Sequence, residues 1–378
     1  MTGDTESLQS RRRTGRRYTI LVFVILAVVA GWTGFWKFAA DKAQHTIDGW
    51  RAREAKSGRI YNCGSQNVGG FPFRIEVTCD QASAIFRSDD PQLELKADRL
   101  LVVAQVYQPG LIISEFHGPL TIGQLGKEPE FLASWKLAQS SVRGTPAAPQ
   151  RASLVFDDPV VDRMSGTSRE NLLRARHIEL HGRIAEGSVT NKPVIEVAVQ
   201  LGQASAPGLH QAAIPPVDAS VTALLRGLND FSPKPWATRF REIQAADGRI
   251  DITNVRIQQG DILAVGAGTL SINGNGRLEG QLRITMAGLE PFLAAIGAQQ
   301  KIQASPHMDK LAGALDRLAP GLGDVARQQA GANLSAGINM LGEQTTLEGK
   351  RAVILPLRFT DGAAFLGPIP IGNTPALF

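Results

Sequence analysis

The sequence has few cysteines, little net charge and none of the common catalytic motifs. Two cysteines among 378 residues are too few for a disulfide-rich scaffold or a four-thiolate zinc site. The formal net charge is +5, and Met1–Arg17 supplies +3 of it, through five arginines opposed by Asp4 and Glu6. The remaining residues therefore carry only +2. This balance does not support a general nucleic-acid-binding surface.

The missing motifs narrow the chemistry further. The chain contains no G-x-S-x-G, no G-x-x-x-x-G-K-[ST] and no H-E-x-x-H, which excludes those hydrolase, phosphate-loop and zinc-helix sites. His177, Glu179 and His181 alternate with apolar residues, but on a strand the two histidines would lie roughly 13 Å apart and could not share one ion. We therefore expect a solvent-facing polar stripe there. We predict no catalytic residue, no metal site and no cofactor.

The one long apolar run is Tyr18–Trp36, nineteen residues without a charge. At 1.5 Å rise per residue, such a helix is long enough to cross a bilayer. The Arg-rich tail, residues 1–17, precedes this transmembrane helix, residues 18–36. By the positive-inside rule the tail is cytoplasmic and everything after Trp36 is exported. A cleaved signal peptide is the alternative, although the run is longer than the usual apolar region of such a peptide.

A stripe at helical spacing follows the apolar run, and Gly58 marks a stop. The stripe consists of Trp36, Ala40, Ala43, Ile47 and Trp50. We expect an amphipathic connecting helix, residues 37–58, that docks this stripe on the body of the protein. A helix lying on the lipid surface is the alternative use of the same pattern.

Cys63 and Cys79 flank the turn Gly69–Gly70, so a hairpin could bring the two thiols together. In a cytosolic protein two such cysteines would more often be free buried thiols. Because the predicted topology exports this region, we predict a Cys63–Cys79 disulfide.

From Arg59 onward the dominant signal is short strands with one apolar face, as in Phe73–Val77 and Ile195–Leu201. Within Gly248–Gly288 the turn Asn273–Gly276 joins two such strands, which predicts a β-meander. The fold class is therefore mainly β with α insertions (α+β). We predict an extended curved antiparallel sheet or half-barrel with capping helices, preceded by the transmembrane helix.

The expected helices begin at Asp218 and also span Pro235–Ala246, Glu290–Gln300 and Pro306–Ala319. Residues 143–150 and 202–216, rich in proline, glycine and alanine, are the candidate loops or boundaries. The second of them separates an N-terminal β-rich part, residues 59–201, from a part with helical segments and the C-terminal meander, residues 217–378.

The one-faced strands outnumber the helices that could cover them, which suggests an apolar groove suited to acyl chains. Its candidate lining residues are Leu278, Leu282 and Ile284 in the meander. A filled sandwich core is the alternative, and periodicity alone favours it.

Three turn-and-strand segments carry a resemblance to a known family. They are Gly69–Arg74 (GGFPFR) ahead of the strand into Cys79, Gly276–Gly280, and the closing stretch Leu355–Phe359 with Gly367–Gly372. Together they resemble the domain of unknown function 2125 family, membrane-anchored proteins of bacterial envelopes. The resemblance implies an architecture and a location in the cell envelope, and no reaction. An anchor followed by repeated strands is also similar, more distantly, to AsmA-like envelope proteins, which are associated with phospholipid handling.

These observations and the resemblance predict a non-enzymatic, single-pass inner-membrane protein with a periplasmic body. We expect it to bind or handle lipid in envelope maintenance. Its expected partners are the membrane, through the N-terminal helix, and phospholipid; we expect no nucleic acid, and the sequence identifies no protein partner. The alternative is a structural, partner-binding envelope protein with a filled core and no ligand. A less favoured reading is an envelope hydrolase with unrecognised residues.

Overall fold

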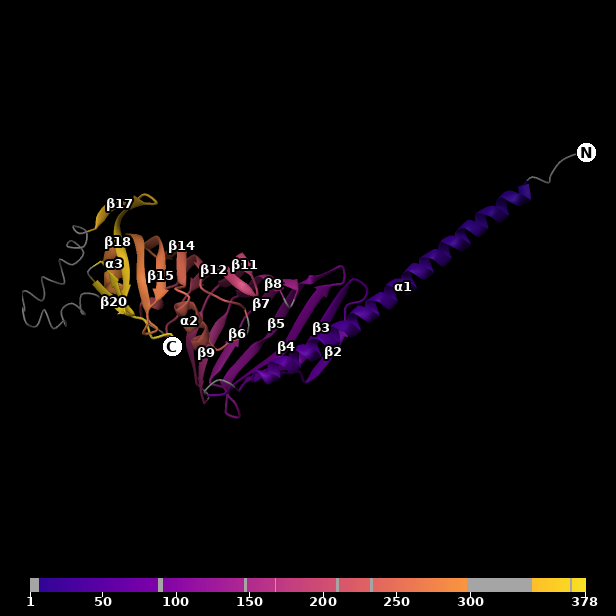
Figure 1. Ribbon diagram of the computed structural model, residues 1–378, viewed down its shortest axis with the longest axis horizontal. Helices are drawn as coiled ribbons and strands as arrows, with labels where there is room; N and C mark the ends of the chain where they lie inside the picture. The colour runs from indigo at the N-terminus through magenta and orange to yellow at the C-terminus, as the bar shows by residue number, and fades with distance from the viewer. Residues whose placement is uncertain are drawn as a thin grey trace, which may run out of the picture. The chain divides into compact units, whose positions relative to one another are not determined.

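A computed structural model describes residues 7–87, 91–145, 148–166, 168–208, 211–231, 234–297, 342–367 and 369–378. The chain forms two compact units, Met1–Glu128 and Pro129–Phe378. Each unit is built on antiparallel strands with few helices, which confirms the mainly β fold class (Figure 1). The division falls after Glu128, whereas the loops predicted as boundaries lie at 143–150 and 202–216.

The first unit combines one long helix with a small sheet. Its elements are α1 (Ser7–Lys56), β1 (Arg59–Asn62), β2 (Ser65–Gly69), β3 (Arg74–Phe86), β4 (Leu93–Gln105) and β5 (Gln108–Gln124). Strands β1 and β2 lie in line along one edge of β3, and β4 and β5 follow on its other side. The β2–β3 hairpin sets Gln66 opposite Cys79, and Cys63 is bonded to Cys79, so the predicted disulfide is confirmed.

Helix α1 is uninterrupted from the apolar run to the sheet (Figure 1). Its residues from Tyr18 to Gly31 are exposed, and it is the one helix in the described part of the chain long and apolar enough to cross a membrane. Beyond that run, Ala40 is buried and Gln66 Nε2 donates to Gln44 Oε1 at 2.8 Å. The predicted docking of the helix on the body is therefore confirmed.

The second unit is dominated by long strands. Its strands are β6 (Phe131–Ser134), β7 (Leu137–Thr145), β8 (Ala148–Asp157), β9 (Val160–Ser165), β10 (Ser168–Arg174), β11 (His177–Ser188), β12 (Asn191–Ala204), β13 (Val217–Leu225), β14 (Arg249–Gln259), β15 (Ile262–Ile272), β16 (Leu278–Ala287), β17 (Glu343–Leu347), β18 (Lys350–Thr360), β19 (Ala363–Leu366) and β20 (Ile369–Asn373). Its helices are η1 (Gln211–Ala213), α2 (Trp236–Ala245) and α3 (Leu289–Ala295) in the part described.

Antiparallel pairing runs in the order β7, β8, β11, β12, β13, β14, β15, β16, β18. Strands β17 and β19 both pair with β18, β20 extends β19, and β6, β9 and β10 pair among themselves. The predicted meander is the run β14–β15–β16, and it is confirmed. No described pairing closes this sheet into a barrel.

The largest core of the second unit packs against the meander and α3. Its buried members are Ala264, Leu270, Leu282, Ile284, Met286, Leu289, Leu293, Val353, Leu355 and Leu366. Leu282 and Ile284 are only 5% and 6% exposed, and burying each side chain contributes about 1.5–3 kcal/mol. Two of the three candidate groove residues, Leu282 and Ile284, therefore lie inside a packed cluster, whereas Leu278 is partly buried and is not among its members.

Two helices and one loop test the sequence predictions. The helix predicted from Asp218 is wrong, because the segment is strand β13, paired along both edges with β12 and β14. The helix over Pro235–Ala246 is confirmed as α2. Within the segment 143–150, residues 143–145 end β7 and residues 148–150 begin β8, and these two ends pair with each other.

The remaining predicted helices are only partly described. Helix α3 accounts for the start of Glu290–Gln300, and that segment leaves the described residues after Gly297. The helix predicted over Pro306–Ala319 lies outside the described residues.

Candidate functional site

The second unit contains an apolar cavity of about 410 Å³ between α2 and the sheet, here called the α2 cavity. Its walls are Ile195 and Val197 of β12, Leu225 of β13, Phe240 and Ile243 of α2, and Leu270 and Ile272 of β15. Ligand sites in proteins usually measure 300–1,000 Å³ and are mostly apolar with few polar groups. The cavity falls within this class.

Two glycines hold one end of α2 against the sheet. A Cβ on Gly248 would lie 2.5 Å from the Arg226 carbonyl oxygen and 2.7 Å from that of Ile243. Gly227 has a φ of +97°, and a Cβ there would lie 2.5 Å from the Gly248 Cα. Because neither position has room for a side chain, the helix approaches the strands closely at this end. Ile243, only 3% exposed, fills the contact.

The other end of α2 presents aromatic rings to solvent. Trp236 is 76% exposed and stacks on Phe240 with ring centroids 5.9 Å apart. Phe231, which also lines the cavity, is 42% exposed. The cavity therefore has a closed glycine end and a mouth bordered by aromatic rings.

Residues near the C-terminus close one side. Leu377 lines the cavity, and its N–H donates to the Gly276 carbonyl oxygen at 2.8 Å. The Arg241 guanidinium lies 5.0 Å from the centroid of the Phe378 ring, a cation–π contact. These contacts attach the final residues to α2 and to the β15–β16 turn.

The charged groups at the mouth neutralise one another. Lys234 Nζ lies 2.9 Å from Glu242 and 3.1 Å from Asp230, and Arg239 donates to the Asp230 carbonyl oxygen at 2.7 Å. Burial opposes ionisation of Glu242, but hydrogen bonds from Lys234 and the Asn229 N–H outweigh it and lower the pKa of this carboxyl. The mouth thus pairs two cations with two carboxylates around an apolar interior.

A second cluster of polar side chains lies on the neighbouring strands β8 and β11. His177 contacts Asp157 and Glu179, each at 2.6 Å, and His181 lies 2.8 Å from both Glu179 and Ser153 Oγ. The carboxylates of Glu179 and Asp157 raise the pKa of His177, and the two histidines lower the pKa of Glu179. The predicted polar stripe is confirmed as a hydrogen-bonded row, and the described residues include no metal-binding group of three or more such side chains.

Ser153, His181 and Glu179 are hydrogen-bonded in the sequence that a catalytic triad uses: a hydroxyl nucleophile, a histidine base and a carboxylate that orients the base. Neither of the two cavities described here contains Ser153. The row lies along regular strands, where backbone N–H groups serve the sheet rather than an oxyanion.

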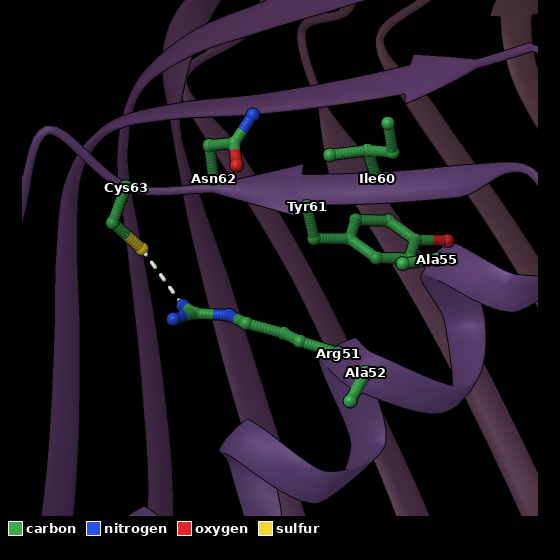
Figure 2. A pocket seen from close by; sticks show the side chains of 7 residues that line it. All are labelled: Arg51, Ala52, Ala55, Ile60, Tyr61, Asn62 and Cys63. Atoms are coloured by element: carbon green, nitrogen blue, oxygen red, sulfur yellow. Dashed lines mark hydrogen bonds between the residues drawn. The ribbon is translucent and has the colours of Figure 1, made fainter.

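In the first unit, a recess of about 430 Å³ with both polar and apolar lining residues lies where the end of α1 meets β1. Figure 2 shows Tyr61 of β1 and Cys63, which directly follows β1, projecting toward the helix, where Arg51 Nη2 donates to Cys63 Sγ at 3.0 Å. Trp50 stacks on Tyr61 at 4.7 Å, and burial, with the nearby Glu54 charge, raises the pKa of Tyr61. These contacts hold α1 on the sheet beside the disulfide.

The cavity in the structure is not the groove that the sequence predicted, because the two are lined by different residues. Leu282 and Ile284 belong to the packed core, and the α2 cavity is lined by other residues. The sequence located α2 but missed the cavity, because its floor includes Leu225 of β13, which the sequence assigned to a helix. The close Gly227–Gly248 approach left no periodic signal.

The described residues thus form an antiparallel β-sheet protein with a long apolar helix near the N-terminus, a disulfide and an apolar cavity. The chain belongs to the family described as uncharacterized protein conserved in bacteria (DUF2125), whose model matches residues 36–375. No curated protein matches the chain. The family resemblance is thereby confirmed, and the similarity to AsmA-like proteins stays a prediction.

Proposed function

We propose that this protein is a non-enzymatic, single-pass inner-membrane protein whose periplasmic body binds one acyl chain of a phospholipid in the α2 cavity. The observation that carries the proposal is the cavity itself: about 410 Å³, walled by aliphatic and aromatic side chains. An acyl chain offers no hydrogen bonds, so an apolar wall suits it better than it suits a polar metabolite.

The mouth supports a lipid of low net charge. Lys234 and Arg239 are already paired with Asp230 and Glu242. Arg249, which also lines the cavity, is paired with Asp251, so an incoming phosphate would meet paired cations rather than a free one. Phosphatidylethanolamine carries both charges in its headgroup and matches this arrangement. The exposed Trp236 and Phe231 rings add apolar surface at the entrance.

Topology is supported by independent features. The five arginines before Tyr18 favour a cytoplasmic tail, and the Cys63–Cys79 bond favours an oxidising compartment for the body. Reporter fusions at Gly58 test this directly. Alkaline phosphatase should be active there and a cytoplasmic fluorophore dark, whereas the reverse pattern contradicts the proposal.

The cavity is tested with a phospholipid that carries a photoreactive group on its acyl chain, in vesicles containing the full chain. Adducts should map to peptides from β12 and α2. Val197→Trp fills the cavity and should abolish them. Gln200→Trp, on the opposite, exposed face of the same strand, should leave them unchanged. Adducts confined to α1 in the wild type contradict lipid binding by the body.

The alternative is a partner-binding protein with no ligand, and the tight packing of Leu282 and Ile284 favours it. A hydrolase is a further alternative because Ser153 lies 2.8 Å from His181. A fluorophosphonate probe distinguishes them: we expect no labelling of Ser153, and labelling that Ser153→Ala removes would establish a hydrolase.

A further inference from the structure

The first unit exposes three aromatic side chains at one end of its sheet. Phe71 and Phe73 belong to the loop between β2 and β3, and Tyr107 lies in the turn between β4 and β5. They are 51%, 63% and 68% exposed. The Val106 N–H donates to the Phe73 carbonyl oxygen at 3.0 Å, which ties the turn to the loop. We call Phe71, Phe73 and Tyr107 the aromatic tip.

The tip is joined to the apolar part of α1. Trp32 Nε1 donates to the Pro72 carbonyl oxygen at 2.9 Å, and Trp36 Nε1 donates to that of Arg74 at 2.8 Å. Ring contacts follow the same path, since Trp36 meets Phe71 edge-on at 5.5 Å and Trp32 lies 6.2 Å from Phe73. Trp32 precedes the end of the apolar run by four residues, about 6 Å along the helix axis. The tip therefore reaches the level at which the run ends.

Most carbonyl groups of the loop are hydrogen-bonded within the unit. The carbonyl oxygens of Gly70, Pro72, Phe73 and Arg74 all accept hydrogen bonds within the unit, and Pro72 has no N–H to satisfy. Backbone polar groups in contact with lipid must be satisfied internally because no water is present to do so. An ordinary solvated turn has no such need.

Charges flank the aromatic rings on the side away from the apolar run. Lys37 on α1 is exposed, and Arg74, which pairs with Glu76, follows the loop. Aromatic rings at the headgroup level with basic residues beside them are typical of a membrane interface.

We propose that the aromatic tip inserts into the outer headgroup region of the same membrane that α1 crosses, and so fixes how the first unit stands on the bilayer. The proposal rests on the proposed membrane span of α1. The partner is the lipid surface, because the tip continues the exposed apolar surface of the helix. A second copy of the chain is the competing occupant.

The test places the photoreactive residue benzoylphenylalanine at Phe73, at Tyr107 or at Lys96 in the full chain, in vesicles of phosphatidylethanolamine and phosphatidylglycerol. Lys96 is the control: it is exposed on β4, nine residues and about 30 Å along the strand from Gln105, which pairs with Arg74. Lipid adducts should form at positions 73 and 107 and be absent at 96.

Alkaline carbonate extraction of the same vesicles reports separately on α1. If the chain is retained but positions 73 and 107 give no lipid adduct, the tip proposal is overturned and the membrane span stands. If the chain is extracted and no adduct forms, both are overturned. Protein dimers crosslinked through position 73 would show that the tip contacts a second copy of the chain. Lipid adducts at position 96 as abundant as those at position 73 would overturn the proposed orientation of the first unit on the bilayer.

Discussion

Adjacent glycines in the GGFPFR loop should respond oppositely to the same substitution. Gly70 has a φ of +94°, and a Cβ there would lie 2.7 Å from the Arg74 carbonyl oxygen and 2.9 Å from Glu76 Cγ. A Cβ on Gly69 would meet nothing within 4 Å, and its φ is not in the left-handed region. The pair therefore provides a perturbation and its matched control within one turn.

The cost of Gly70→Ala has two parts. Placing an L-residue in the left-handed region costs about 1–2 kcal/mol. The displaced Arg74 carbonyl oxygen is the acceptor for Trp36 Nε1, and losing that bond adds about 1 kcal/mol. We expect Gly70→Ala to lower the free energy of unfolding of the first unit by about 2–3 kcal/mol. Gly69→Ala should instead stabilise it by up to about 1 kcal/mol, by restricting the unfolded chain.

Hydrogen exchange of the full chain, read on peptides covering residues 65–86, gives the local opening free energy. Faster exchange in Gly70→Ala, with unchanged or slower exchange in Gly69→Ala, is the expected result. Equal effects of the two substitutions, or a harmless Gly70→Ala, would refute the docked geometry of the loop.

Three further predictions concern stability. The bond between Cys63 and Cys79 closes a loop with a sequence separation of 16, so its removal by double alanine substitution should cost about 3 kcal/mol in denaturant unfolding; an unchanged midpoint contradicts this. Leu282→Ala should cost about 2–5 kcal/mol and Leu282→Asp should unfold the second unit, whereas a folded aspartate variant would indicate an open groove. The pKa of His177 is raised, so its contribution to stability is complete below pH 6.5 and is lost as pH rises through the folded-state pKa; the pKa of Glu179 is lowered, so its contribution is present above pH 4.5 and is lost as pH falls. An NMR titration should show the His177 pKa falling in Glu179→Gln, and an equal, ordinary value in both proteins would refute the contact.

Features set by local chemistry could be predicted from the sequence. The uncharged run Tyr18–Trp36 required only its length and composition, and Asn273–Gly276 required only the tolerance of Asn-Gly for positive φ. The disulfide followed from two cysteines on either side of a glycine turn together with the export predicted from the apolar run. Each of these signals lies within a single stretch of chain.

Features set by distant contacts could not be predicted. Val221, Leu224 and Leu225 fit a helical stripe, but β12 and β14 on either side satisfy the backbone of this segment as a strand. The α2 cavity depends on the close approach of Gly227 to Gly248, and the aromatic tip depends on indole hydrogen bonds from Trp32 and Trp36 across 40 and 38 residues. The hydrophobic periodicity of a segment does not indicate which distant segments it contacts.

The central claim is that the α2 cavity holds a phospholipid acyl chain. The most direct measurement is native mass spectrometry of the full chain, delipidated and then titrated with phosphatidylethanolamine, for the wild type, Val197→Trp and Gln200→Trp. The account predicts one saturable bound lipid in the wild type and in Gln200→Trp, and its loss in Val197→Trp. Equal lipid binding by all three proteins, or none by the wild type, would contradict it.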